Sequence, residues 1–380
     1  MQVEKLSSSV DAKKILTSLG VDSGGINILA SKMKHHIIYI KDLHVGGANI
    51  LKQDALSIGA DLAVPRGTVT AKTPHVDCIL IATGKQLEIL SKKELAQPFG
   101  LKELAKKLKK FTQIKKPSHV EIMGVINAND DSFFSESRFH GTRAIDRIVN
   151  MIEEGADIID IGGVSSRPNS LRVSAQEELQ RVKPILDAIN KEKLHEKIRF
   201  SIDSYEPKVI SYALESGFQI VNDITGLEND EVCKLCSSYG ATAVIMHMQG
   251  IPQTMQNNPI YDDIINNVYT FLEDRINKAE SFGISDIIVD VGIGFGKTLE
   301  HNLTLIKHLE NFLILEKKVL VGASRKSLMN EIYPSSAQER LPGTLALHLE
   351  ALRNGASILR VHDVSEHKQA IMVQKSLDRI

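Results

Sequence analysis

The chain has 380 residues, of which 42% are hydrophobic and 24% are charged. These fractions are ordinary for a globular protein and exclude disorder, a collagen-like chain and a coiled coil as the main state. The 46 Lys and Arg nearly balance the 47 Asp and Glu, so the chain has no general attraction for nucleic acids or anionic membranes. Only 5% of the residues are aromatic and none is Trp, which argues against a stacking surface for single strands.

The first 100 residues predict a small α/β domain. Helical patterns cover 11–19 and 48–58, apolar runs at 37–40, 61–64 and 78–82 predict strands, and Ser91-x-x-Glu94 is typical of a helix start. Gly46 and Gly47 follow a strand and open a helix, so their amides could cradle the phosphate of a cofactor. The sequence there lacks a full nucleotide-binding fingerprint, and a structural or oligomerising domain is the main alternative.

Residues 101–117 predict an amphipathic helix with a basic outer face, because seven Lys accompany one Glu and four apolar residues recur at helical spacing. Pro117 is expected to stop this helix. We interpret it mainly as a solvated linker helix, and an anion-binding or partner-binding surface is the alternative. The predicted division is therefore an N-terminal extension at 1–118 and a second domain at 119–380.

From residue 119 onward, buried strands and helices alternate. Eight apolar runs predict parallel strands, at 120–126, 156–161, 198–202, 218–221, 241–246, 286–291, 318–323 and 357–361. Ser174-x-x-Glu177 and Ser335-x-x-Gln338 resemble capping boxes of two of the intervening helices. Glycines are expected to end five helices just before a strand, at Gly155, Gly217, Gly240, Gly283 and Gly355. Eight regular units predict a closed (β/α)₈ TIM barrel rather than a doubly wound open sheet.

Polar side chains follow every predicted barrel strand, at the end where such barrels carry their chemistry. Strands three, four and six end in Asp203, Asn222 and Asp290, an acidic and amide cluster. A basic cluster follows strands seven and eight, with Arg325, Lys326, Arg360 and His362. The sequence thus predicts a ligand with a donor-rich ring at one end, since carboxylates accept paired N–H groups, and a phosphate at the other. Asn127, after strand one, could share Mg²⁺ with that phosphate.

Cys78, Cys233 and Cys236 do not form a disulfide framework, and the Cys233-x-x-Cys236 pair has no second pair to complete a zinc site. The N-terminus lacks the pattern of a signal peptide, and no apolar run approaches the length of a membrane span. We therefore expect a cytoplasmic protein that binds neither nucleic acid nor membrane.

The barrel segment resembles dihydropteroate synthase of the pterin-binding family from about residue 119 to 380. The matching strings occur in order, one per strand end: IMGVINANDDSFF, GADIIDIGGVSSRP, SIDS, IVNDITG, VIMHMQGIPQTMQ, IIVDVGIGFGKT, GASRKS and ILRVHDV. Pterin-binding methyltransferases are expected to share the barrel and the ring-binding Asp and Asn, but not the SRKS and RVHD strings. The resemblance therefore favours a synthase of folate biosynthesis over a methyl-carrying enzyme.

The resemblance implies that the diphosphate of 6-hydroxymethyl-7,8-dihydropterin is displaced by the amine of p-aminobenzoate, giving 7,8-dihydropteroate and pyrophosphate. It implies four groups of site residues. Pterin would be bound by Asp203, Asn222, Ile224, Met246, Asp290, Phe295, Gly322, Lys326 and Arg360. The diphosphate would contact Asn127, Arg360 and His362, with Asn127 on Mg²⁺, and p-aminobenzoate would contact Phe133, Ser166, Arg167 and Ser327. Lys326, Asp131, Arg360 and His362 would be the catalytic set.

The first loop departs from the family pattern, since Asn129 and Asp130 stand where Thr and Pro are usual. Ser166 replaces a usual Thr, Val164 a usual Glu and Val291 a usual Pro. None of these changes removes a ring-binding or phosphate-binding group, so we expect activity, a homodimer, and sensitivity to sulfonamides. A non-catalytic pterin-binding paralogue stays open as an alternative, as does a second activity in the N-terminal extension.

Overall fold

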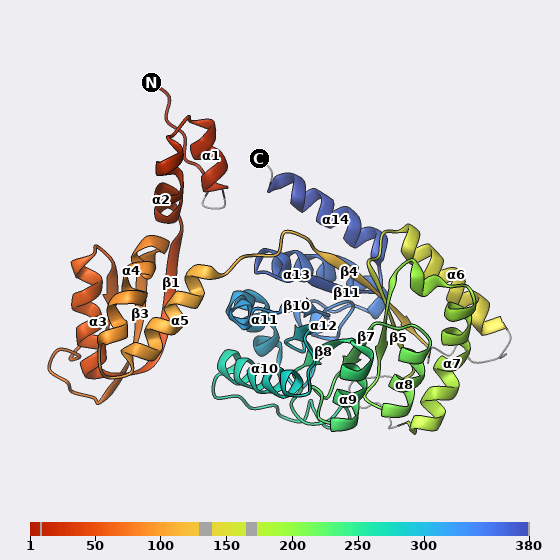
Figure 1. Ribbon diagram of the computed structural model, residues 1–380. Helices are drawn as coiled ribbons and strands as arrows, with labels where there is room; N and C mark the ends of the chain where they lie inside the picture. The colour runs from red at the N-terminus through yellow and green to blue at the C-terminus, as the bar shows by residue number, and fades with distance from the viewer. Residues whose placement is uncertain (8–9, 129–138, 165–172, 379–380) are drawn as a thin grey trace. The chain divides into compact units, whose positions relative to one another are not determined.

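The structure is a computed structural model that describes residues 1–7, 10–128, 139–164 and 173–378. Contacts between residues divide the chain into two compact units. One is Met1–Lys115, which groups with the C-terminal residues from Ser376, and the other is Lys116–Lys375 (Figure 1). Each unit is described separately below.

The N-terminal unit is built on an antiparallel sheet of three strands in the order β1-β3-β2. Its elements are α1 (Ala12–Ser18), α2 (Ser23–Met33), β1 (His35–His44), α3 (Val45–Ser57), β2 (Asp61–Ala63), β3 (His75–Thr83), α4 (Gly84–Lys93) and α5 (Leu101–Gln113). Strand residues alternate between two faces. One face, with Cys78 and Leu80, packs against Leu51, Leu87 and other apolar residues of the helices. The other face leaves the large side chains of Ile37, Tyr39, Ile79 and Ile81 exposed.

The second unit is a closed barrel of eight parallel strands in the order β10-β11-β4-β5-β6-β7-β8-β9. The strands are β4 (Glu121–Asn127), β5 (Ile158–Gly162), β6 (Arg199–Asp203), β7 (Ile220–Asp223), β8 (Thr242–Met246), β9 (Ile287–Asp290), β10 (Lys318–Val321) and β11 (Ile358–Val361). The helices are α6 (Phe139–Glu153), α7 (Ala175–Lys191), α8 (Pro207–Glu215), α9 (Asp230–Tyr239), α10 (Ile264–Ser281), α11 (Leu299–Lys307), α12 (Leu328–Ile332), α13 (Leu341–Arg353) and α14 (Val364–Leu377). The predicted TIM barrel is confirmed.

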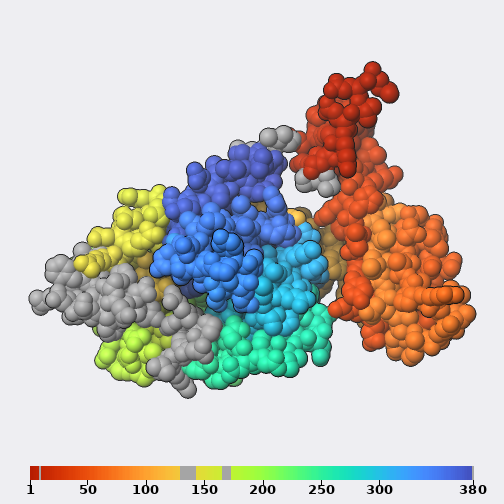
Figure 2. Space-filling view, turned by 180° about the vertical axis from the view of Figure 1, so that it is seen from behind, coloured from red at the N-terminus to blue at the C-terminus, as the bar shows by residue number. Residues whose placement is uncertain are grey.

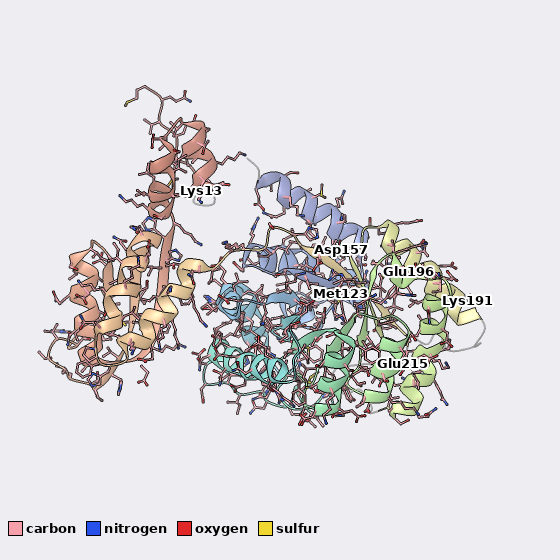
Figure 3. The ribbon with its side chains drawn as sticks, in the orientation of Figure 1. Lys13, Met123, Asp157, Lys191, Glu196 and Glu215 are labelled. Atoms are coloured by element: carbon pink, nitrogen blue, oxygen red, sulfur yellow. The ribbon has the colours of Figure 1, made fainter. Side chains whose placement is uncertain are left out.

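Two apolar layers hold the barrel together. Met123, labelled in Figure 3, belongs to an inner cluster with Ile158, Ile220, Val244, Ile288, Leu320 and Ile358, which fills the interior of the strand ring. A larger cluster lies between the strands and the surrounding helices, and the C-terminal helices in blue cover much of the barrel unit in Figure 2. The barrel is therefore a packed core whose chemistry lies at its rim.

Most predicted element boundaries in the barrel are confirmed within two residues. Ser174 caps α7 by accepting the Glu177 amide at 3.2 Å, and the five glycines that end helices all have positive φ. The predicted box at Ser335 is wrong by one residue, because Ser336 and Glu339 form it. No helix among the described residues is long and apolar enough to cross a bilayer.

Two expectations for the N-terminal unit are wrong. No helix begins at Ser91: the capping box is Thr83 with Gln86, Ser91 lies inside α4, and Glu94 is fully buried. The helix α2 was not predicted. Gly46 and Gly47 do open α3, but the Gly46 amide donates to Nδ1 of His44 at 3.1 Å, and a side chain on either glycine would meet Phe99. Close packing against Phe99 accounts for these glycines, and a cofactor phosphate stays a prediction.

Candidate active site

Two of the side chains predicted at the strand ends, Asp203 and Asn222, are linked to Arg360 by hydrogen bonds, Asn222 through Asp160. Asn222 and Asp290 are buried, and Asp203 is half-buried at the end of β6. Arg360, on β11, donates through Nε to Asp160 Oδ2 and through Nη2 to Asp203 Oδ2, both at 2.6 Å. Asn222 also donates to Asp160, at 3.2 Å. The rim of the barrel thus carries one connected polar network drawn from four strands.

This network holds carboxyl groups in an environment that disfavours their charge. Burial raises the pKa of Asp203 to about 7, although the Arg360 guanidinium opposes the shift. Burial also raises the pKa of Asp290, whose Oδ1 accepts the Gly292 amide at 2.7 Å. A ligand that donates N–H groups to these oxygens would replace part of the lost solvation.

An apolar cluster adjoins the carboxylates. Ile224, Met246 and Phe295, three of the predicted pterin residues, pack together with Met255. Lys326 lies with Nζ 4.3 Å from the centre of the Phe295 ring and donates to the Ile293 carbonyl. Burial lowers the pKa of Lys326 to about 8, while nearby Asp290 opposes the shift. The site therefore offers apolar side chains with acceptors and one ammonium donor beside them.

The loop after β9 is fastened by Lys297, a fully enclosed lysine. Its Nζ donates to the carbonyls of Gly292, Phe295 and His247 at 2.9, 2.9 and 3.2 Å and lies 3.0 Å from Nδ1 of His247. Burial lowers the pKa of Lys297 to about 7 and that of His247 to about 3. The loop approaches so closely that a Cβ on Gly292 would lie 1.9 Å from the His247 carbonyl oxygen.

The residues after β10 and β11 form a second polar group. Arg325 donates to both oxygens of Asp363, through Nε at 2.9 Å and Nη2 at 2.5 Å. Ser324 and the His362 ring nitrogen Nδ1 lie 2.9 Å apart. Gly322 lies beside Arg360, where a Cβ would make only an ordinary contact at 3.6 Å, and Ser327 is exposed at the start of α12.

Five further predicted site residues remain, of which one is described by the structure and four are not. Asn127 ends β4 beside Gly162 of β5, on the same rim. Asp131, Phe133, Ser166 and Arg167 lie outside the described residues. Among the residues that are described, no three His, Cys, Asp or Glu side chains gather as a metal site.

Two residues of the site were missed from the sequence, and one was placed incorrectly. Asp160 is fully buried beneath Arg360, and a charged residue inside the apolar run of β5 was the signal for it. For Lys297 the only signal in the sequence was its position after the last glycine of a Gly-rich loop. Arg360 does not stay with the basic cluster, because it pairs with Asp160 and Asp203. The predicted separation of acidic and basic ends is therefore wrong for Arg360.

Comparisons with known proteins show the family of the chain. Residues 123–362 match the pattern of the pterin binding enzyme family. The bifunctional dihydropteroate synthase/dihydropteroate reductase of Helicobacter pylori is 42% identical over 366 residues, which cover 96% of each chain. The chain belongs to the dihydropteroate synthase family. It is therefore a transferase of folate biosynthesis that transfers a group other than methyl.

Solved dihydropteroate synthases have the same barrel. The Yersinia pestis enzyme, in a complex with a sulfonamide drug, aligns with a TM-score of 0.65 at 34% identity and covers 69% of this chain and 96% of its own. The Thermus thermophilus enzyme, in complex with 4-aminobenzoate, aligns with a TM-score of 0.61 at 36% identity and covers 68% and 95%. The N-terminal unit lies largely outside both alignments, whereas the Helicobacter pylori relative extends over most of it.

Proposed function

We propose that the rim of the barrel binds 6-hydroxymethyl-7,8-dihydropterin diphosphate and p-aminobenzoate and joins them to give 7,8-dihydropteroate and pyrophosphate. The observation that carries this proposal is the network of Asp160, Asp203, Asn222 and Arg360 beside the apolar cluster of Ile224, Met246 and Phe295. A planar heterocycle rich in N–H donors has the shape and polarity that this combination recognises.

The polar groups divide the work of ring recognition. Asp290 would accept from the amino-pyrimidine edge of the pterin, because an ionised carboxylate offers two parallel acceptors. Asn222 can both donate and accept, and Lys326 would donate to the ring carbonyl and a ring nitrogen. Asp203 would exchange part of its bond with Arg360 for a ring N–H. The ion pair between Asp160 and Arg360 would stay formed during that exchange.

The reaction breaks the bond between the pterin methylene carbon and the diphosphate oxygen, and the electron pair leaves with the diphosphate. The p-aminobenzoate nitrogen then forms a bond to the cationic methylene carbon and loses a proton. Arg360 and His362 would stabilise the leaving diphosphate, and donors that are already oriented lower the barrier most. Asp131, which lies outside the described residues, is proposed to belong to the catalytic set on the family resemblance.

Magnesium fits this scheme as a partner of the diphosphate. Mg²⁺ keeps several waters and takes few protein ligands besides phosphate oxygens, so the single neutral oxygen of Asn127 on the rim is a suitable donor. When bound, the ion would neutralise charge on the leaving diphosphate. Phe133, Ser166, Arg167 and Ser327 are proposed to line the p-aminobenzoate site.

A coupled assay tests the proposed reaction. Purified protein with the pterin diphosphate, p-aminobenzoate and Mg²⁺ is expected to release pyrophosphate and form 7,8-dihydropteroate in equal amounts, and sulfonamides are expected to compete with p-aminobenzoate. Binding of the pterin without pyrophosphate release would instead establish a non-catalytic pterin-binding protein. Light scattering of the same sample tests the proposed homodimer.

We also propose a second activity, reduction of dihydropteroate, which involves the N-terminal unit. The supporting observation is that the bifunctional Helicobacter pylori relative matches 96% of this chain, and therefore most of Met1–Lys115. A pocket of about 400 Å³ in this unit is lined by Arg66, Lys72 and His75, which could bind a cofactor phosphate, and by Asp42 and Asp77, which would repel it. Oxidation of reduced nicotinamide or flavin by dihydropteroate is the test, and no oxidation with either donor would refute the proposal.

A further inference from the structure

The helix α13 holds the loop that follows β10, residues 322–327, by its backbone. The Ala323 amide donates to Nε2 of His348 at 3.0 Å, and the Arg325 amide donates to Oγ1 of Thr344 at 3.0 Å. Thr344 and His348 are one helical turn apart on α13, and both are almost completely buried. Two side chains on one face of α13 thus accept hydrogen bonds from two backbone amides of the loop that carries Lys326.

The same histidine continues into a chain of hydrogen bonds that reaches the end of β11. His348 Nδ1 lies 2.8 Å from Nε2 of His367, a buried residue of α14. His367 Nδ1 lies 2.6 Å from the carbonyl oxygen of Asp363. The Asp363 carboxylate binds Arg325. The two imidazoles therefore connect the β10 loop to residues 362–363 from behind the site.

The bonding partners determine which nitrogen carries each proton. An amide can only donate, so His348 Nε2 must be an unprotonated acceptor and its proton must lie on Nδ1. His348 then donates to His367 Nε2, which must also be unprotonated. His367 Nδ1 consequently carries a proton and donates to the Asp363 carbonyl. An additional proton on either ring would place two donors against each other and break the chain.

We propose that His348 and His367 form a relay of two neutral imidazoles that positions the β10 loop and the end of β11 for synthase catalysis. Neither ring touches the substrate groups assigned above, so both are positioning residues. His348 positions the loop of Lys326 through the Ala323 amide. His367 positions Asp363, which binds Arg325 and follows His362 in the sequence. The kinetic effects expected of this relay rest on the synthase reaction proposed above.

The electrostatic surroundings favour the neutral form. Burial lowers the pKa of His348 far below its ordinary value, and the positive charges that Lys326, His362 and a protonated His367 would carry act in the same direction. Burial also lowers the pKa of His367, although Asp363 and Glu366 oppose the shift. Because both folded pKa values lie below the unfolded ones, the stabilisation from the relay is present at neutral pH and is lost as the pH falls through the folded values.

Kinetics of two His348 variants in the full chain test the positioning role. His348→Phe leaves the Ala323 amide without an acceptor in a buried site, and we expect about a tenfold loss of kcat/KM, mainly through a higher KM for the pterin diphosphate. His348→Gln places an amide oxygen near the position of Nε2 but cannot be protonated. It should recover kcat/KM to within about threefold of the wild type and retain more activity than the wild type on acidification. His119→Gln, at an exposed histidine, is the control and should behave as the wild type.

Nuclear magnetic resonance of protein labelled with ¹⁵N-histidine tests the relay without any assay. Two histidines should carry their proton on Nδ1, and the His348→Gln and His367→Gln variants assign their signals. Protonation on Nε2 in either ring, wild-type kinetics for His348→Phe, or equal losses for Phe and Gln would each overturn the relay. If His348→Phe does not fold, the kinetics of His348→Gln and the positions of the imidazole protons decide whether the relay exists. An inactive wild type with both protons on Nδ1 would refute the reaction and retain the relay.

Discussion

Lys326 is the residue whose environment is most specific to the proposed reaction. Its ammonium lies over Phe295 and beside Asp290, at the edge of the apolar cluster. Lys326→Ala should remove a hydrogen bond to the pterin ring and lower kcat/KM at least about tenfold, or about 1.4 kcal/mol. Steady-state kinetics measure this loss, and Lys307→Ala, at an exposed lysine of α11, is the matched control. Wild-type kinetics in the Lys326 variant would refute the assigned role.

Asp160 is expected to matter for stability as well as activity. Asp160→Asn would place a neutral amide against the Arg360 guanidinium in a buried site. Because Arg360 keeps Asp203 as a partner, the expected loss of stability is smaller than the ~3–5 kcal/mol that follows removal of the sole partner of a buried charge. Chemical denaturation should show that loss, together with a higher KM for the pterin diphosphate. Asp187→Asn breaks an ion pair with Lys183 of which both side chains are about half exposed (48% and 50%), and it should change stability little. Equal effects of the two substitutions would show that Arg360 does not depend on Asp160.

Residue-scale prediction from the sequence succeeded where a side chain sits at a strand end. Asp203 and Asn222 were identifiable because each follows an apolar run directly, and Asp290 because it lies next to the end of its run and before a Gly-rich loop. Asp160 was not, because it lies two residues before the end of β5 inside such a run. The partners of Arg360 could not be derived, since they depend on which side chains meet across a closed barrel between residues far apart in the chain. The pairing of His348 with His367 was hidden for the same reason.

At the scale of elements, alternation of apolar runs predicted all eight barrel strands because buried parallel strands are continuously apolar. The same reasoning failed in the N-terminal unit. The helix α2 contains Gly24 and Gly25, which weaken a helical pattern, and it buries no residue completely. Ser91 resembled a cap, but its hydroxyl donates to the Glu88 carbonyl within α4. Local patterns therefore predicted elements best where a large core determined them.

The loop after β9 provides a test at this scale. Gly292 has a φ of 68° and no room for a Cβ, which would lie 1.9 Å from the His247 carbonyl oxygen. Gly292→Ala should displace the loop held by Lys297, abolish pterin binding and lower the melting temperature. Gly240→Ala is the matched control, because Gly240 has a φ of 62° but nothing within 4 Å. It should cost only the backbone term of about 1–2 kcal/mol. Similar stabilities and intact pterin binding in both variants would contradict the tight fit.

At the scale of the whole molecule, buried carboxyl groups make stability depend on pH in an unusual direction. Burial, assisted by the charge of Asp54, raises the pKa of Glu94 from 4.5 to about 7. Burial likewise raises the pKa of Glu178 to about 7. Since each folded pKa exceeds the unfolded one, the contribution to stability is fully present below pH 4.5 and is lost as the pH rises through 7.

Glu94→Gln isolates this effect in the N-terminal unit. The variant should lose less stability than the wild type between pH 5 and pH 8, because the buried group no longer ionises near 7. Denaturant titrations at a series of pH values measure the difference, and Glu4→Gln, at an exposed residue, is the control. A wild-type pH dependence in the Glu94 variant would show that this carboxyl group does not titrate in that range.

The uncovered face of the N-terminal sheet has a practical consequence. Ile37 and Tyr39 on β1 lie opposite Ile81 and Ile79 on β3, and β1 is an edge strand of ten residues. Exposed apolar side chains beside an edge strand favour precipitation or fibril formation when a domain is expressed alone. Anyone who expresses residues 1–115 alone should therefore anticipate poor solubility, and replacing Ile37 and Ile81 with lysine is the change we would make first.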